Sequence, residues 1–166
     1  MALLVLSVAG SDRPGLTRAL AAAVLSAGGN WLESHLSRLG GLYVGSVLVE
    51  GDADKLRMAV SAVDAAGLDV RIAPAGAGPA PAGETLAFSV VGQDRPGIVR
   101  QVTATISELG ANIESFRTWL STEAHSGAPL FHIAAKLSLP ARLSAGRVQD
   151  ALEAISGEIM VDVAVE

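Results

Sequence analysis

Two short segments of this chain carry the residue types of an anion-binding loop. They read Gly-Ser-Asp-Arg-Pro-Gly at positions 10–15 and Gly-Gln-Asp-Arg-Pro-Gly at positions 92–97. Glycine permits a tight turn and a close approach of a ligand to the backbone, and proline is tolerated where a helix begins. The free N–H groups and the dipole at the start of a helix favour an anion such as a carboxylate. Each segment therefore predicts a loop that binds the carboxylate of a small molecule.

Polar side chains in and after these loops add to the predicted chemistry. Asp12 and Asp94 can receive the ammonium group of a ligand, or can instead cap the helix that follows. Asn30 and Asn112 follow the two loops at the same distance and offer both hydrogen-bond donors and acceptors. The arginine of each motif can add a bidentate contact to a carboxylate. Together these groups predict a site for a small amino acid.

The same pattern also has a purely structural interpretation. Glycine, aspartate and proline are good turn residues between a strand and a helix, whether or not a ligand binds there. On residue chemistry alone, a ligand-binding loop and a simple turn remain equally open.

The rest of the sequence predicts no catalytic centre, metal site or cofactor. The absence of cysteine excludes disulfides, thiolate metal sites and a cysteine nucleophile. His35, His125 and His132 stand alone, without the spacing of metal ligands. The chain has no Gly-x-Ser-x-Gly nucleophile motif, and positions 10–15 lack the Lys-Ser/Thr pair of a P-loop.

The two loops belong to a repeat that covers the chain. Residues 10–30 and 92–112, at an offset of 82, are identical at nine of 21 positions. This offset is about half of the chain, which indicates a duplicated domain. Between the copies, residues 74–83 are small or proline and carry no charge, as is typical of a linker. We therefore expect domains at 1–73 and 84–166.

Each copy shows the same order of predicted elements. Apolar residues alternate before each loop, as in a half-buried strand, and recur with helical spacing after it. Two strands, a second helix and a last strand follow. The order βαββαβ predicts an α+β fold of two ferredoxin-like domains, each with an antiparallel sheet and both helices on one face.

Two differences between the copies are expected. Glu33-Ser34 aligns with Glu114-Ser115 only if the first copy has one extra residue, which a β-bulge would absorb. The second copy has about ten more residues between its asparagine and its second helix. Its segment 121–129 has loop composition and predicts a long hairpin loop.

Composition narrows the class of protein. Half of the 166 residues are apolar, so a packed core is expected. The net charge is −5 and the 12 Lys and Arg residues are scattered, which disfavours direct binding to nucleic acid. No uncharged apolar stretch approaches the length of a membrane span. The lack of cysteine fits a cytoplasmic protein.

The duplicated motif, its place after the first strand and the asparagine that begins the second strand resemble the ACT domain, a small βαββαβ regulatory module that typically binds amino acids. The resemblance covers both halves of the chain. It implies a ligand between ACT domains, near the first loop and the start of the second strand. The ligand-binding residues that it implies are Gly10, Asp12, Arg13, Pro14, Gly15, Asn30, Gly92, Asp94, Arg95, Pro96, Gly97 and Asn112.

The resemblance further implies an amino-acid-sensing regulatory protein and not an enzyme. Glycine or serine is the expected ligand. Because the chain has no DNA-binding element, the expected partner is a protein such as a transcription factor, and homo-oligomers are expected as well. Two alternatives remain: an ACT-type interaction module with vestigial ligand loops, and an accessory subunit of an enzyme of amino-acid metabolism.

Overall fold

The chain forms two separate compact units. A computed structural model describes residues 1–78, 83–155 and 157–166, and contacts divide the chain into Met1–Gly78 and Pro79–Glu166. Each unit has its own sheet and its own pair of helices.

The predicted linker, 74–83, lies partly outside the described residues, because 79–82 are not among them. Its first residue, Pro74, is the last residue of a strand in the first unit. The N–H of Ala75 donates to the carbonyl of Leu3 at 2.9 Å, so backbone pairing continues into the linker region. The domain bounds at 73 and 84 stay a prediction.

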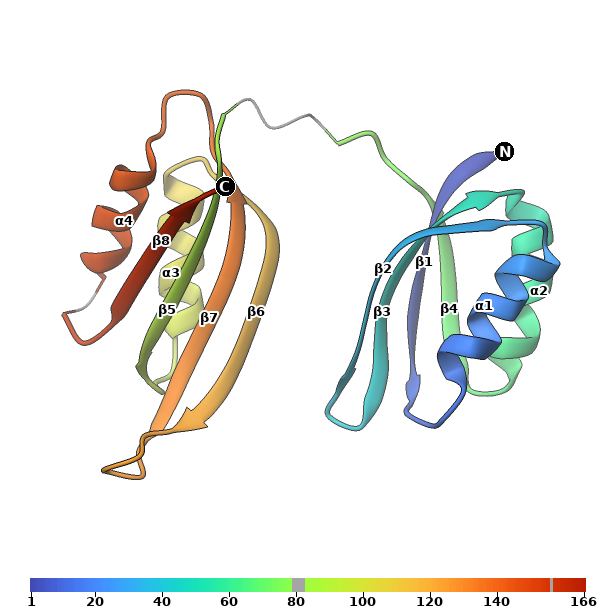
Figure 1. Ribbon diagram of the computed structural model, residues 1–166, viewed down its shortest axis with the longest axis horizontal. Helices are drawn as coiled ribbons and strands as arrows, with labels where there is room; N and C mark the ends of the chain where they lie inside the picture. The colour runs from blue at the N-terminus through green and yellow to red at the C-terminus, as the bar shows by residue number, and fades with distance from the viewer. Residues whose placement is uncertain (79–82, 156) are drawn as a thin grey trace. The chain divides into compact units, whose positions relative to one another are not determined.

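The first unit is a four-stranded antiparallel sheet with two helices on one face (Figure 1). The strand order is β2-β3-β1-β4, so β3 and β1 are central and β2 and β4 form the edges. In chain order the elements are β1 (Ala2–Ser11), α1 (Leu16–Ser26), β2 (Asn30–Leu39), β3 (Leu42–Gly51), α2 (Ala53–Ala65) and β4 (Leu68–Pro74).

The second unit repeats this topology with the strand order β6-β7-β5-β8 (Figure 1). The predicted α+β fold of two ferredoxin-like βαββαβ modules is therefore confirmed. The elements are β5 (Thr85–Gln93), α3 (Ile98–Glu108), β6 (Asn112–Thr122), β7 (Pro129–Ser138), α4 (Ala145–Glu153) and β8 (Met160–Val165).

Each unit has its own hydrophobic core between its sheet and its helices. The predicted alternation in the first strand is confirmed, since Leu4, Leu6 and Val8 are buried while their neighbours on the strand are more exposed. Successive side chains of a strand point to opposite faces, so this alternation directs one face of the sheet to the helices. The other face of each sheet, here called the open face, is not covered by the helices of its own unit (Figure 1).

Most of the extra residues of the second unit lie in two loops, and β6 is one residue longer than β2. The hairpin between β2 and β3 uses only residues 40–41, whereas the one between β6 and β7 uses 123–128. The predicted hairpin loop at 121–129 is therefore correct in place but too long, because the β6–β7 pairing extends to Thr122 opposite Pro129. The remaining difference lies before the second helix, where residues 139–144 take the place of Asp52 alone.

The prediction that the first unit has one extra residue is wrong. The pairing of β2 with β3 shifts by one residue between Trp31 and Glu33, as a β-bulge requires. The pairing of β6 with β7 shifts in the same way between Ile113 and Ser115. Both units thus carry the bulge at the same distance from their asparagine, and the two Glu-Ser pairs are not structural equivalents.

Candidate functional site

The two predicted loops have the same backbone conformation. Each joins the first strand of its unit to the first helix, and each helix is preceded by a glycine in the left-handed region. Gly15 has φ 90° and ψ 1°, and Gly97 has φ 87° and ψ 0°. Side chains other than glycine rarely adopt this conformation, so the second glycine of each motif is required by the turn. Pro14 and Pro96 precede these glycines and so lie outside the helices.

The first glycine of each motif is required for a different reason. A Cβ at Gly10 would lie 2.5 Å from the carbonyl oxygen of Gly67, and one at Gly92 would lie 2.8 Å from Cγ2 of Ile159. Both neighbours belong to the segment just before the last strand of the unit. The glycines of the motifs are therefore accounted for by the fold, without a ligand.

Asp12 and Asp94 do not cap the helices. The N–H of Asp12 donates to the carbonyl of Gly41 at 3.1 Å, and that of Asp94 donates to the carbonyl of Pro129 at 3.1 Å. These bonds attach each loop to the neighbouring hairpin. Neither α1 nor α3 has a side-chain cap among the described residues, so neither carboxylate is used to cap a helix.

The missing caps distinguish α1 and α3 from the other two helices. Asp52 caps α2 by accepting hydrogen bonds from the N–H groups of Asp54 and Lys55, both at 3.0 Å. The backbone hydrogen bond from Lys55 is the main reason why the pKa of Asp52 is lowered from its ordinary value. Ser144 caps α4 through the N–H of Arg147 at 3.3 Å. Within the described chain, the first turns of α1 and α3 thus keep N–H groups without a side-chain acceptor.

The side chains around the two loops differ. In the first unit, Nε of Arg38 lies 3.3 Å from Oδ2 of Asp12, and Leu120 takes the place of this arginine in the second. Asp94 forms no ion pair within the described part of the chain. In the motif itself, a guanidinium nitrogen of Arg95 donates to Oε1 of Gln101 at 2.8 Å. The two loops share a backbone shape but not a charge environment.

A second polar contact is also specific to the first unit. The hydroxyls of Thr17 and Tyr43 lie 2.8 Å apart, and Tyr43 pairs with Gly10 at the start of the loop. Val99 and Phe131 occupy the corresponding places in the second unit. Sequence reasoning missed Thr17, Tyr43 and Arg38 as neighbours of the loop. The available signal was the Gly40-Gly41 turn, which places the end of β2 and the start of β3 beside the end of β1.

The structure does not bring the asparagines to the loops within one unit. Asn30 pairs with Glu50, which lies opposite Leu3 near the start of β1, whereas the loop follows the other end of that strand. From Leu3 to Gly10 the strand spans about 23 Å at about 3.3 Å per residue. The helix α1 runs back along the sheet, so β2 has to begin at the end far from the loop. Asn112, opposite Ser138, has the same position in the second unit.

Other classes of site find no support in the described residues. Outside 79–82 and 156, no group of three or more His, Cys, Asp or Glu residues could hold a metal ion. No helix in the part of the chain that the structure describes is long and apolar enough to span a membrane.

Comparisons with known proteins agree with this architecture. Residues 2–72 match the family model of the ACT domain. A comparison with curated protein sequences finds no match. An unknown protein from Galdieria sulphuraria is similar in structure, with a TM-score of 0.86 and 29% sequence identity over 99% of this chain and 98% of that one. A provisionally assigned glycine cleavage system transcriptional repressor has a TM-score of 0.66 and 17% identity over 99% of this chain and 97% of its own. At 17% identity, the second comparison shows a similarity of fold alone.

Proposed function

We propose that this chain is an amino-acid-sensing regulatory protein built of two ACT domains, of which the family model matches the first and the second has the same strand order. The observation that carries the proposal is the contrast between the helices. Both helices that follow an Asp-Arg-Pro-Gly loop lack a side-chain cap among the described residues, whereas α2 and α4 are capped. A ligand carboxylate is the group that the uncapped first turns can accept.

In the proposed binding mode, the carboxylate of the ligand accepts hydrogen bonds from first-turn N–H groups of α1 or α3. Its ammonium group then needs an acceptor at the same end of the sheet. Asp94 is the better candidate, because Asp12 is already paired with Arg38. Arg13 and Arg95 lie in the same loops and add positive charge for the carboxylate. Glycine or serine fits such a turn, since neither has a large side chain to place.

Asn30 and Asn112 enter this site only from another ACT unit. Within its own unit each asparagine lies at the opposite end of the sheet from the loop. A second unit that brings the start of its β2 or β6 to the loop would supply the amide. The proposed site is therefore completed by pairing of ACT units.

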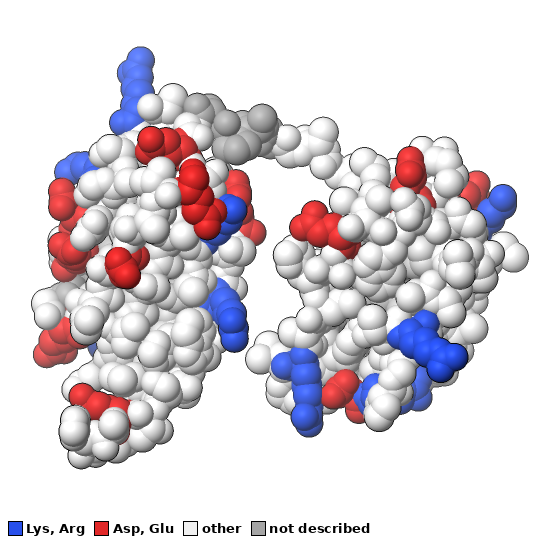
Figure 2. Space-filling model, in the orientation of Figure 1, with Lys and Arg blue, Asp and Glu red and all other residues white. Residues whose placement is uncertain are grey.

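We further propose that the signal passes to a protein partner and not to DNA. The net charge is −5, and Lys and Arg residues are interspersed with acidic ones on the face shown in Figure 2. Nucleic-acid binding draws on clustered cations. In its more specific form, we propose a cytoplasmic transcriptional regulator of the glycine cleavage type. It would act through a transcription factor, without catalysis and without a cofactor.

One observation favours a second candidate, an interaction module with vestigial loops. The four motif glycines have conformational or packing reasons that need no ligand. If the loops are turns only, amino acids will not stabilise the protein.

A melting-temperature screen against the amino acids separates the two candidates. A ligand at about 100 times its Kd contributes roughly 2.7 kcal/mol to the stability of the protein that binds it. We expect glycine or serine to raise the Tm. The double variant Asp12→Asn, Asp94→Asn should lose this increase, because it lacks the carboxylates proposed for the ammonium group.

The matched control is Asp54→Asn, Asp69→Asn, which removes the same charge at exposed positions outside the loops. An increase in Tm that survives in the loop variant and in the control alike would place the ligand elsewhere. No increase with any amino acid would favour the interaction module.

A further inference from the structure

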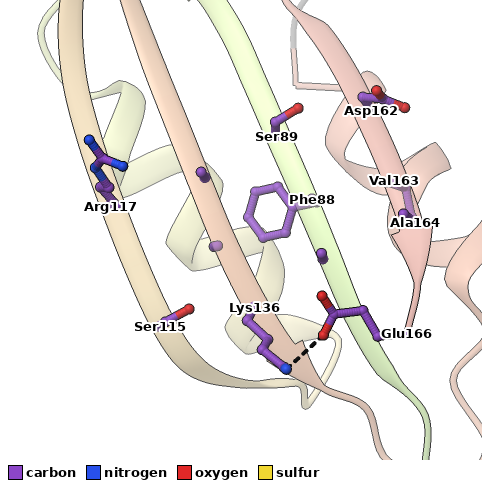
Figure 3. Close-up of a pocket in the computed structure, with 12 residues that line it drawn as sticks. Phe88, Ser89, Ser115, Arg117, Lys136, Asp162, Val163, Ala164 and Glu166 are labelled. Atoms are coloured by element: carbon purple, nitrogen blue, oxygen red, sulfur yellow. Dashed lines mark ion pairs between the residues drawn. The ribbon is translucent and has the colours of Figure 1, made fainter. Parts of the chain in front are cut away.

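The open face of the second sheet is hollowed and charged. Figure 3 shows this hollow, which has a volume of about 520 Å³. Its lining includes alanine and serine residues, Phe88 and Val163, together with charged side chains from β6, β7 and β8. The polar and charged residues that line it are Ser89, Ser115, Arg117, Lys136, Asp162 and Glu166.

Two of these charges are already neutralised by each other. Nζ of Lys136 lies 2.6 Å from Oε2 of Glu166. Arg117 and Asp162 form no ion pair with any described residue. The guanidinium carbon of Arg117 lies 5.1 Å from the centroid of the Trp119 ring, a contact that holds the arginine on this face.

Arg117 and Asp162 stand at the two ends of one row across the sheet. Arg117 pairs with Ala134 on β7, Ala134 pairs with Ser89 on β5, and Ser89 pairs with Asp162 on β8. The row thus has a cation on one edge strand, an anion on the other and two small residues between. Its charges are placed symmetrically about its centre and are opposite in sign.

A surface with this pattern is complementary to itself. Consider a half-turn about an axis that is parallel to the strands, lies between the two facing sheets and is level with the centre of the row. It places Arg117 of each copy over Asp162 of the other. Such an arrangement is an isologous contact, in which residue i meets j and j meets i. The small residues at the centre permit the close approach of two sheets, which pack about 10 Å apart.

The neighbouring row fits the same operation. It runs from Trp119 through His132 and Val91 to Met160. The ring of Trp119 is stacked on that of His132 with centroids 5.0 Å apart, and both Trp119 and Met160 are exposed, at 40% and 76%. The half-turn places the exposed tryptophan of one copy over the exposed methionine of the other, so both large apolar groups become covered.

We infer that the open face of the second sheet is a homodimer interface, on which the same face of a second copy docks with its row reversed. The equivalent row of the first unit does not have this property. It runs from His35 through Ser46 and Ser7 to Arg71 and has no carboxylate at either end, so a half-turn would not pair opposite charges. The inference therefore concerns the second unit and is independent of any amino-acid ligand.

The area of the face sets the expected affinity. Four strands about 4.8 Å apart and about seven residues long give a face of roughly 20 by 23 Å. Two such faces bury on the order of 1,000 Å², at the lower end of specific interfaces. We expect a reversible dimer at micromolar concentrations, weakened by salt because its ion pairs lie at the rim.

Sedimentation velocity of the full chain between about 1 and 200 µM tests the inference. Arg117→Glu should weaken dimerisation at least about tenfold, because Glu meets Asp162 of the second copy at both ends. Asp162→Arg should do the same, because two arginines then meet. An equimolar mixture of the two variants should dimerise as the parent does, since every contact in the mixed dimer joins opposite charges.

The mixture is the decisive measurement, because a variant that has lost its fold cannot regain association by mixing. Arg71→Glu, at the equivalent edge of the first unit, is the matched control and should associate like the parent. The inference is overturned if the parent stays monomeric at about 200 µM, as it would if a different protein covers this face. It is equally overturned if the single variants dimerise normally or if the mixture fails to restore the dimer.

Discussion

Glycine is required at four places in the two loops, for two different reasons. Gly15 and Gly97 adopt left-handed backbone conformations, and a Cβ at either position would have no atom within 4 Å, so the constraint there is conformational. Gly10 and Gly92 have ordinary φ values but are crowded by the segment before the last strand. The same residue type is thus required at the two positions of a motif for different physical reasons. Substitutions at the two kinds of position should therefore destabilise the protein for different reasons.

At the residue scale, the clearest prediction compares two glycines of the second unit. Gly97→Ala should lower the free energy of unfolding by about 1–2 kcal/mol, because alanine is strained in the left-handed region. Gly146→Ala should raise it by about 0.5–1 kcal/mol, because Gly146 lies within α4, has free space around it and loses more entropy on folding than alanine does. Urea denaturation measures both. Equal effects would contradict the conformation assigned to Gly97.

The helices differ in how their first turns are satisfied, and this difference is testable through pH. The pKa of Asp52 is lowered by the hydrogen bonds that it accepts as the cap of α2. A carboxyl whose pKa is lower in the folded state stabilises the protein above its unfolded pKa and loses this effect as the pH falls through the folded value. Its contribution is therefore present at pH 7 and disappears below about pH 4.

Asp52→Ala should accordingly lower the Tm at pH 7, and the difference from the parent should shrink steadily between about pH 4 and pH 2. Ser144→Ala is the matched control, because it removes a neutral cap from α4. Its cost of about 1 kcal/mol should not vary with pH over this range. Parallel pH profiles for the two variants would contradict the charged cap.

On the scale of the whole molecule, each unit has a core built from its own residues. We therefore expect residues 1–78 to fold alone, although a unit of this size is only marginally stable. Circular dichroism during thermal unfolding of this fragment should show a cooperative transition. Leu6→Ala, at a fully buried position, should lower its stability by about 2–5 kcal/mol, whereas Leu25→Ala, at an exposed one, should have little effect.

Much of this architecture follows from local patterns in the chain. The repeat, the alternating strands, the amphipathic helices and the Gly40-Gly41 hairpin depend on residues close in sequence, because side-chain period and turn chemistry are local properties. The same holds for the C-terminal glycines of α1 and α3, Gly28 and Gly110, which adopt the left-handed conformation expected there. The two predicted loops accordingly lie where the sequence pattern places them.

Other features depend on which strands pair and in what register, and these are set by contacts far apart in sequence. The packing of α1 back along the sheet places Asn30 at the far end of the sheet from Asp12, although both residues flank this helix. Register likewise decides that the bulge is common to both units, and that Arg117 and Asp162 end one row. A one-residue slip would move either side chain to the other face. No local pattern contains that information, so only long-range pairing of the folded chain supplies it.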